Sequence, residues 1–291
     1  MFRGSLVALV TPMSPDGAVD YACLERLVDW HLAAGTDGLV IAGTTGESAT
    51  LTKAEHVEVI RVAAARVAGR IPVIAGTGSN STAQTVDLSR AVGSLPIDAY
   101  LIVVPYYNKP TQEGMYRHFC AVADAVDKPI MLYNVPGRTV ADLLPPTVGR
   151  LAQHPRIFGI KEATGDLARV AQIRAVAGTS FALYSGDDAS AREFIGLGGQ
   201  GVVSVTANVA PAEMAAMCRA ALAGRADEAA QLDSRLAHLH RDLFLESNPI
   251  PVKWMLERMG RIPSGIRLPL TPLAASSRPA MEAAMRQAGL L

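Results

Sequence analysis

The 291-residue sequence has little of several features that would place it in particular classes of protein. Its three cysteines, Cys23, Cys120 and Cys218, lie far apart and form no C-x-x-C pair, which argues against a disulfide framework or a zinc site and favours reduced thiols. The 27 basic and 27 acidic residues cancel, so the chain lacks the positive charge that binds nucleic acid or an anionic membrane. We therefore expect a cytoplasmic protein that acts on small molecules.

Long hydrophobic runs are also missing, although the mean hydropathy is slightly positive at +0.21. Each apolar run is cut by glycine, proline or a charged residue, so none approaches the roughly 20 residues that span a bilayer. The first run, residues 6–10, follows one positive charge and is too short for the core of a signal peptide. The sequence thus predicts a soluble protein with no membrane partner.

One unit recurs along most of the chain: a short β-branched run, a break rich in Gly, Thr and Pro, and an Ala-rich amphipathic segment. Continuous apolar runs are typical of strands buried on both faces, and intervening helices make the connections parallel crossovers. Strands are expected at residues 6–10, 38–42, 73–76, 100–105, 130–134, 158–161, 181–185 and 202–206. Helices between them include 21–34, 53–68 (capped by Thr52), 83–92 and 114–125. Eight units favour an α/β fold of the (β/α)8 TIM-barrel type, with a doubly wound sheet as the alternative.

The pattern changes after Pro211. No further β-branched run occurs, and segments such as 226–245 and 251–259 have the Ala and Leu spacing of helices. We expect a catalytic barrel over residues 1–224 and a helical C-terminal domain over residues 225–291.

Lys161 stands at the end of an apolar run, just before a turn. In a water-poor pocket an ammonium group loses solvation, and its pKa falls from about 10.4 toward neutrality, which makes the amine a nucleophile. Solvated lysines are commoner at strand ends, so the other strand ends must support this interpretation. Glu162, the next residue, should face the helices because side chains alternate along a strand.

Further polar residues follow other expected strands, at the end of a barrel where chemistry collects. The loop 43–48 offers hydroxyls and backbone N–H groups that suit a small carboxylate, and a plain glycine turn is the alternative. Tyr106, Tyr107 and Tyr133 can pass protons on, and Arg138 can hold a second carboxylate. The loop lacks the lysine of a phosphate-binding P-loop, and no metal or other cofactor is expected.

Four motifs together resemble the 4-hydroxy-tetrahydrodipicolinate synthase (dihydrodipicolinate synthase) family of pyruvate-dependent Schiff-base aldolases. They are G-T-T-G-E-S at 43–48, P-Y-Y-N at 105–108, Y-N-V-P-G-R-T at 133–139 and G-I-K-E-A at 159–163. The resemblance runs from residue 2 to residue 291 and includes N-P-I-P-V-K-W at 248–254. It implies a homotetramer (a dimer of dimers) of TIM barrels with a helical C-terminal domain. Its members condense pyruvate with L-aspartate 4-semialdehyde on the diaminopimelate route to lysine.

The resemblance also implies roles for four catalytic residues. Lys161 would form the Schiff base with pyruvate, and Tyr133 would donate and accept protons. Thr44 and Tyr107 would complete the proton relay, with Tyr107 supplied by the neighbouring subunit. This chemistry needs an amine, a proton shuttle and a carboxylate anchor, all of which the motifs contain.

Substrate-binding residues follow from the same resemblance. Thr45 would hold the carboxylate of pyruvate and Arg138 that of the semialdehyde, while Gly186 and Val203 would line the pocket. The positions that match the family's lysine-inhibition site are Ser48, Ala49, His56, Asn80 and Tyr106.

Two residues depart from the lysine-sensitive pattern, Lys53 where histidine is common and Gln84 where glutamate is common. Each change disfavours a cationic effector by about 1 kcal/mol or more, so we expect weak or absent feedback by lysine. His56 itself is expected at a surface or an interface rather than as a metal ligand.

Two rival functions remain open at this point. The first is another pyruvate-dependent aldolase, such as an N-acetylneuraminate or 2-keto-3-deoxy sugar lyase. Arg138 and the pair Tyr106-Tyr107 argue against it, because a polyhydroxyl substrate calls for different polar groups. The second is a barrel that binds a keto acid without catalysis.

Overall fold

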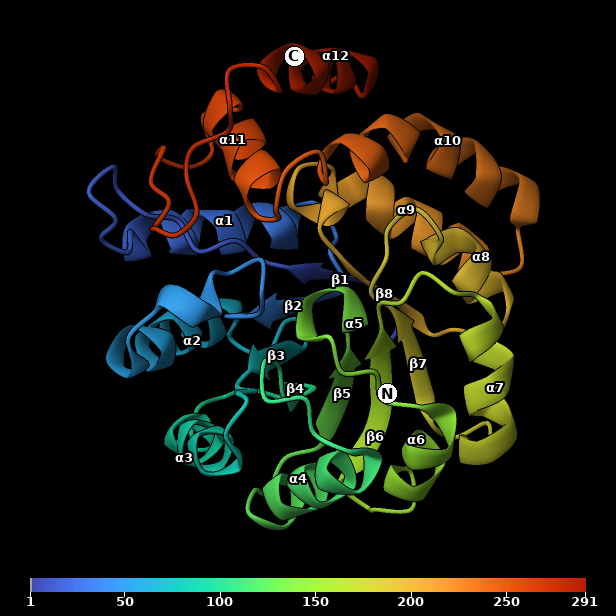
Figure 1. The fold of residues 1–291 in the computed structure, drawn as a ribbon. Coiled ribbons are helices and arrows are strands. Elements are labelled where there is room, and N and C mark those ends of the chain that lie inside the picture. The colour runs from blue at the N-terminus through green and yellow to red at the C-terminus, as the bar shows by residue number, and fades with distance from the viewer. Residues whose placement is uncertain (1) are drawn as a thin grey trace.

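The computed structural model describes residues 2–291 and contains a closed barrel of eight parallel strands (Figure 1). Each strand pairs with the next along the chain, and β1 pairs with β8 through Leu6 and Val203 to close the ring. This closure confirms the (β/α)8 barrel and rules out the doubly wound sheet. The strands are β1 (Gly4–Ala8), β2 (Gly38–Ile41), β3 (Val73–Gly76), β4 (Ala99–Val103), β5 (Ile130–Asn134), β6 (Ile157–Glu162), β7 (Ala182–Ser185) and β8 (Gly201–Ser204).

Helices surround the barrel and supply the crossovers (Figure 1). Thr52 caps α2 as expected, in a capping box with Glu55 in which each side chain satisfies a backbone N–H of the first turn. The side chains of Asp20, Ser81 and Thr111 each accept one backbone N–H in the first turn of α1, α3 and α4, without the reciprocal bond of a capping box. The surrounding helices are α1 (Tyr21–Ala33), α2 (Lys53–Val67), α3 (Thr82–Val92), α4 (Gln112–Asp124), α6 (Pro145–Leu151), α7 (Ala168–Ala177), α8 (Ala191–Gly196) and α9 (Pro211–Leu222).

Several strand ends differ from the sequence prediction by one or two residues. β1 and β4 end two residues early, at Ala8 and Val103, and β8 ends at Ser204 because residues 206–208 form the short 3-10 helix η2 (Thr206–Asn208). Apolar runs continue beyond these strands because the following residues are also buried, so hydrophobicity alone overstates their length.

Alternation along the strands divides the core into two layers. One set of side chains fills the barrel and the other packs against the helices, each buried aliphatic side chain contributing about 1.5–3 kcal/mol. The interior set consists of Leu6, Ala8, Val40, Ile74, Ala99, Leu101, Met131, Tyr133, Val135, Ala182, Tyr184 and Val203.

The C-terminal region is helical, as predicted, with α10 (Ala226–Asp242), α11 (Ile250–Arg258) and α12 (Arg278–Gln287). α10 packs along α9 and also contacts α8, while α11 and α12 lie together at one edge of the molecule (Figure 1). α11 also contacts η2, which follows β8. The division into domains at residues 224 and 225 stays a prediction. Residues 2–291 contain no helix that combines the length and the apolar character needed to cross a membrane.

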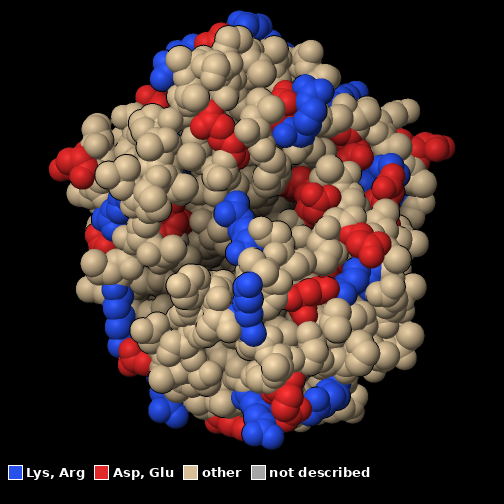
Figure 2. Space-filling model, in the orientation of Figure 1, with Lys and Arg blue, Asp and Glu red and all other residues tan. Residues whose placement is uncertain are grey.

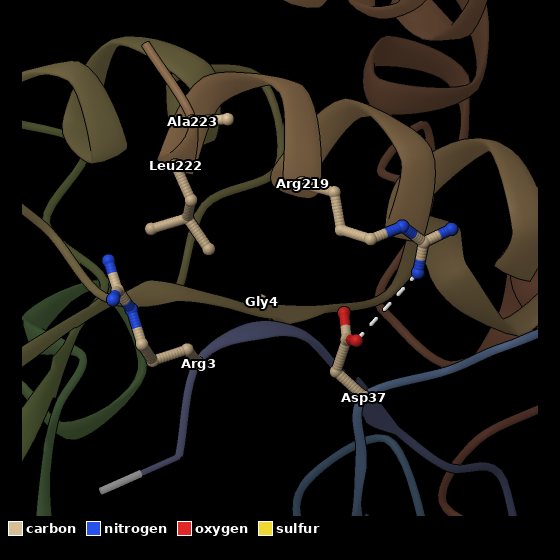
Figure 3. A pocket seen from close by; sticks show the side chains of 6 residues that line it. All are labelled: Arg3, Gly4, Asp37, Arg219, Leu222 and Ala223. Carbon is tan, nitrogen blue, oxygen red and sulfur yellow. Dashed lines mark ion pairs between the residues drawn. The ribbon is translucent and has the colours of Figure 1, made fainter.

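The N-terminal ends of the strands carry a shallow pocket of about 320 Å³ (Figure 3). Asp37 accepts a hydrogen bond from the Ser5 N–H at 2.9 Å, and its carboxylate lies 3.8 Å from an Arg219 nitrogen of α9. Arg3 lines the other side of the pocket. These contacts fasten α9 to the strand ends, the stabilising role that is usual at this face of a barrel.

Candidate active site

Lys161 lies inside the barrel at the opposite, C-terminal end of β6. It is 7% exposed, and its Nζ lies 4.2 Å from the centre of the ring of Tyr133, its register partner on β5. The ion-paired lysines among residues 2–291 are Lys53 and Lys253, so the amine of Lys161 faces an aromatic ring without a carboxylate partner. This arrangement keeps the amine away from bulk water and free of a competing ion pair.

Two tyrosines flank Lys161 in the strand register, Tyr133 on β5 and Tyr184 on β7. The Tyr184 hydroxyl donates to the carbonyl oxygen of Phe2 at 2.7 Å, and burial raises the pKa of this phenol. Tyr184 is therefore held in the core by its own hydrogen bond, whereas Tyr133, 6% exposed, lies directly against the amine.

Gly186, just past β7, leaves room for the lysine side chain. A Cβ atom at this position would lie 2.9 Å from Cε of Lys161 and 2.5 Å from Cβ of Ala163. No larger residue fits without moving the lysine. Val203 on β8 is 1% exposed and belongs to the same interior layer.

The loop 43–48 folds back over the end of β2. The Gly43 carbonyl accepts the N–H groups of Gly46 and Ser48 at 3.1 and 3.3 Å, and the Thr44 carbonyl accepts that of Glu47 at 3.1 Å. Thr45 is 3% exposed, and its hydroxyl oxygen accepts a hydrogen bond from the Asn248 side chain at 2.9 Å. The turn thus presents the two threonine hydroxyls in a fixed backbone frame.

Arg138 belongs to the short helix α5 (Pro136–Thr139), which begins directly after β5 and Val135. Its guanidinium group donates to the carbonyl oxygen of Asn248 at 3.3 Å. This contact directs an otherwise exposed cation toward the mouth of the barrel, where it can pair with a carboxylate.

A cleft of about 700 Å³ opens beside these residues at the C-terminal ends of β2 to β5. Thr44, Val135 and Arg138 line it, and Figure 2 shows a hollow on this face with basic side chains at its edge. Lys161 and Tyr133 lie beyond its lining, but Val135 packs in the interior layer together with Tyr133. The cleft therefore borders, through Val135, the interior layer to which Tyr133 belongs.

Tyr107 is placed differently from the other predicted catalytic residues. It is 88% exposed, its φ is +74°, and it does not line the cleft. Tyr106 is 37% exposed and does line the cleft. Within one chain, Tyr107 is not brought to Lys161.

Comparison with known proteins agrees with this geometry. The sequence matches the dihydrodipicolinate synthetase family over residues 1–288. It is 62% identical over 291 residues to the 4-hydroxy-tetrahydrodipicolinate synthase of Methylococcus capsulatus, covering 100% of both chains. It is 59% identical over 291 residues to that of Alcanivorax borkumensis, covering 100% of this chain and 99% of the other. The chain belongs to this family.

Solved structures from the family have the same fold. The chloride-inhibited dihydrodipicolinate synthase of Acinetobacter baumannii, complexed with pyruvate, superposes with a TM-score of 0.99 at 50% identity and 100% coverage of both chains. The enzyme of Cyanidioschyzon merolae with lysine bound gives a TM-score of 0.96 at 43% identity, covering 100% of this chain and 99% of the other. The whole chain, including the C-terminal helices, thus follows the family fold.

The positions that match the family's inhibition site lie mostly along the same cleft. Asn80 does not line it, although the neighbouring Ser79 does, and the Asn80 carbonyl accepts a hydrogen bond from the Asn108 side chain at 2.8 Å. The positions that line the cleft are Ser48, Ala49, His56 and Tyr106.

His56 corrects one expectation, because it is buried at 5% exposure in this chain rather than at the surface. Its Nε2 lies 2.6 Å from the carbonyl oxygen of Gly76, and burial lowers its pKa. The two departures from the family pattern also line the cleft: Lys53 is ion-paired with Asp87, and Gln84 accepts a hydrogen bond from Ser79 at 3.0 Å.

A buried polar network lies on the outer face of β5 and β6, between these strands and the helices. Glu162 points there, as alternation predicts, and forms an ion pair of 3.1 Å with Arg169 of α7. The Asn134 amide donates to the Glu162 carboxylate at 3.2 Å and to Asp142 at 2.8 Å. Arg169 also donates to the Leu143 carbonyl at 2.7 Å, so the network joins β5, β6 and α7.

Sequence reasoning missed three residues near the site: Glu47, Asn248 and Lys253. Glu47 and Lys253 form a buried ion pair, and Asn248 contacts Thr45 and Arg138. The motif that contains Asn248 and Lys253 contributed to the resemblance, but nothing in its spacing relates it to a loop about 200 residues earlier. Within residues 2–291, His, Cys, Asp and Glu form no group of three or more that could hold a metal ion.

Proposed function

We propose that this chain is a 4-hydroxy-tetrahydrodipicolinate synthase, which condenses pyruvate with L-aspartate 4-semialdehyde. One observation carries the proposal: the amine of Lys161 is buried at the mouth of the barrel, without a carboxylate partner and against the ring of Tyr133. Relatives up to 62% identical over the whole chain are named for this activity. The A. baumannii structure, complexed with pyruvate, supplies the first substrate by similarity.

The first half of the reaction activates pyruvate. The nitrogen lone pair of Lys161 attacks the C2 carbonyl, and loss of one water leaves an iminium ion. The iminium then draws electrons from the adjacent methyl group, which gives up a proton and becomes an enamine nucleophile. Tyr133 is the proposed acid and base for these transfers, because its phenol belongs to the ring that covers the amine.

The second half joins the two substrates. The enamine carbon attacks the aldehyde carbon of the semialdehyde, and the resulting alkoxide takes a proton. The amino group of the semialdehyde then attacks the iminium carbon, closes the ring and displaces the Lys161 amine. One water is released overall, and the lysine returns to its starting state.

Carboxylate recognition is assigned to Thr45 for pyruvate and to Arg138 for the semialdehyde. Thr45 is buried in the loop that follows β2, whereas Arg138 is exposed and lines the cleft. A hydroxyl next to backbone N–H groups suits the small buried anion, and a guanidinium fork suits the second carboxylate. Thr44 lines the cleft and is the proposed link of the proton relay, while Gly186 and Val203 shape the space around Lys161.

The last part of the proposal concerns the assembly of this chain into an oligomer. We assign Tyr107 to the relay of a neighbouring subunit in a homotetramer, a dimer of dimers. A largely exposed tyrosine held at a φ of +74° carries a backbone cost of about 1–3 kcal/mol, which a functional role in an assembly would explain. The proposed location is the cytoplasm, consistent with the free cysteines Cys23, Cys120 and Cys218.

Feedback by lysine should be weak or absent. The structure from C. merolae was determined with lysine bound. In this chain the matching region of the cleft carries Lys53, whose ammonium group is paired with Asp87, and the neutral Gln84 supplies no carboxylate for a cationic effector. Steady-state assays with free lysine test this prediction, and inhibition at micromolar lysine would contradict it.

The decisive assay of function compares second substrates at saturating pyruvate. We expect turnover with L-aspartate 4-semialdehyde and a kcat/KM at least about 100-fold lower with sugar aldehydes, because Arg138 recognises a carboxylate rather than a chain of hydroxyls. A preference for the sugar aldehydes that combine with pyruvate to give N-acetylneuraminate or a 2-keto-3-deoxy sugar acid would assign the chain to a different aldolase. A Lys161→Met variant controls for background reaction.

A further inference from the structure

The C-terminal segment reaches across the molecule to the threonine loop. Asn248 precedes α11, and its side-chain nitrogen donates to the hydroxyl oxygen of Thr45 at 2.9 Å, a contact between residues 203 positions apart. Its carbonyl oxygen also accepts the guanidinium group of Arg138 at 3.3 Å. One residue of the C-terminal helical region thus touches both side chains to which the carboxylates were assigned.

The direction of the hydrogen bond from Asn248 matters for Thr45. A hydroxyl group has one proton to donate and two lone pairs that accept. The amide N–H of Asn248 donates to one lone pair of the Thr45 oxygen, so the Thr45 hydroxyl does not donate its own proton to Asn248. The Thr45 proton is therefore free to be donated to an acceptor other than Asn248. Asn248 is 6% exposed, and its side-chain oxygen is buried without a hydrogen-bond partner among residues 2–291, so the contact with Thr45 is made by the amide nitrogen alone.

A second contact holds the two segments at this spacing. Glu47, two residues after Thr45, forms an ion pair with Lys253 in which the side chains are 0% and 5% exposed. The second carboxylate oxygen of Glu47 accepts the backbone N–H of Arg267 at 3.2 Å. A buried ion pair tolerates little displacement, because separating the charges leaves both desolvated. These contacts join the loop to α11 and to the segment that follows it.

We infer that Asn248 is a positioning residue that makes Thr45 a hydrogen-bond donor to the carboxylate of the keto-acid substrate. The inference rests on the proposed function and adds a contribution from the C-terminal helical region to substrate recognition. The Asn248 side chain acts through Thr45.

The expected kinetic signature follows from the chemistry. The carboxylate of pyruvate keeps its charge throughout the reaction, so its hydrogen bond is equally strong in the bound substrate and the transition state. Loss of such an interaction raises KM and leaves kcat nearly unchanged. A residue that only supports the fold would instead lower stability and leave the KM for pyruvate as it was.

Two substitutions of Asn248 should differ in a predictable order. In Asn248→Asp the new carboxylate accepts the Thr45 proton and repels the substrate anion, so the KM for pyruvate should rise about 10- to 100-fold. In Asn248→Ala the hydroxyl is only released, and the rise should be about three- to tenfold. In both variants kcat at saturating pyruvate and semialdehyde should stay within about threefold of wild type.

A double-mutant cycle separates positioning from general damage. If Asn248 acts through Thr45, then Thr45→Val raises the KM for pyruvate, and Thr45→Val/Asn248→Ala raises it no further. Asn208→Ala is a matched control, because Asn208 is also buried but bonds only to backbone groups of Val10, Ala8 and Val205. It should lower the thermal midpoint without changing the KM for pyruvate.

Each result has one meaning. An unchanged pyruvate KM in Asn248→Asp, or additive effects in the cycle, overturns the inference, and so does a parallel loss of kcat and thermal stability. An unchanged KM in Thr45→Val overturns both the inference and the carboxylate role of Thr45. Failure of the proposed function would show differently, because the wild-type protein itself would not condense pyruvate with the semialdehyde.

Discussion

At the ends of β5 and β6, the inner face of the sheet carries polar residues without ion-pair partners among residues 2–291, and the outer face carries polar residues joined in a hydrogen-bonded network. Tyr133 and Lys161 are register partners that point into the barrel, and Asn134 and Glu162 are register partners that point toward the helices. The two pairs are adjacent in sequence and differ only in the face to which the pleat assigns them. Burial is similar, since Asn134 and Glu162 are 0% and 3% exposed and Tyr133 and Lys161 are 6% and 7% exposed.

The outward pair is fully engaged. The Glu162 carboxylate accepts hydrogen bonds from Asn134, from Arg169 and from the backbone N–H of Thr164, and Arg169 in turn pairs with Asp142. The inward amine of Lys161 has an aromatic ring as its neighbour and no ion pair among residues 2–291. Hydrogen-bonded groups fix the strands relative to each other, and a group without a partner remains free to react. Strand alternation lets two consecutive residues serve these separate purposes.

Replacing the inward lysine should have the largest effect on activity. Lys161→Met removes the nucleophile, and kcat/KM should fall at least about 1,000-fold. The unfolding free energy should not decrease, because a buried amine without an ion-pair partner is replaced by an apolar side chain of similar length. Steady-state kinetics and urea denaturation measure the two quantities. Lys109→Met, at an exposed lysine, is the control, and activity comparable to wild type in Lys161→Met would refute the assignment.

Breaking the outward network should have the opposite effect from replacing Lys161. The loss of stability should be large, and the loss of activity should be small. Arg169→Met leaves Glu162 buried without its cation, which should cost about 3–5 kcal/mol of unfolding free energy. Adding Glu162→Gln should recover part of this loss, because the uncompensated charge is then removed. If Arg169→Met were as stable as wild type, the network would have no stabilising role.

The two tyrosines beside Lys161 test the comparison within the barrel. Tyr133→Phe should lower kcat about 100-fold with little change in stability, because it removes the proposed proton donor. Tyr184→Phe should lower stability by about 1 kcal/mol and leave kcat within about threefold, because its hydroxyl bonds only to the Phe2 carbonyl. Equal kinetic effects of the two substitutions would contradict the assignment of the proton transfers to Tyr133.

The smallest expected effect is the pH dependence of the outward carboxylate. Burial raises the pKa of Glu162 above its ordinary value of 4.5, against the opposing effect of Arg169. Because the folded pKa lies above the unfolded one, the contribution of this group to stability is complete below pH 4.5 and is lost as the pH rises through the folded pKa. The unfolding free energy of wild type relative to Glu162→Gln should therefore fall with rising pH, by less than about 1.4 kcal/mol per pH unit. A difference that grows with pH would contradict this sign.

The sequence predicted the barrel, because eight apolar runs and their helical spacers leave few other arrangements, and alternation predicted that Glu162 faces the helices. It did not predict the contacts of Glu47 and Asn248 with residues about 200 positions away, since no local pattern encodes which distant segments meet. It also misplaced His56, whose neighbour, the Gly76 carbonyl, becomes available only when β3 lies beside α2. The predicted strand ends were only approximate, because buried apolar residues continue past the last residue that pairs with a neighbouring strand.

The account depends most on the reactivity of one amine, and chemical trapping tests it directly. Wild-type protein is incubated with pyruvate and borohydride, digested, and analysed by mass spectrometry. We predict a stable reduced pyruvyl adduct on Lys161, with none on Lys53 or Lys253, whose ammonium groups are ion-paired. Absence of the adduct, or its formation on another lysine, would contradict the account.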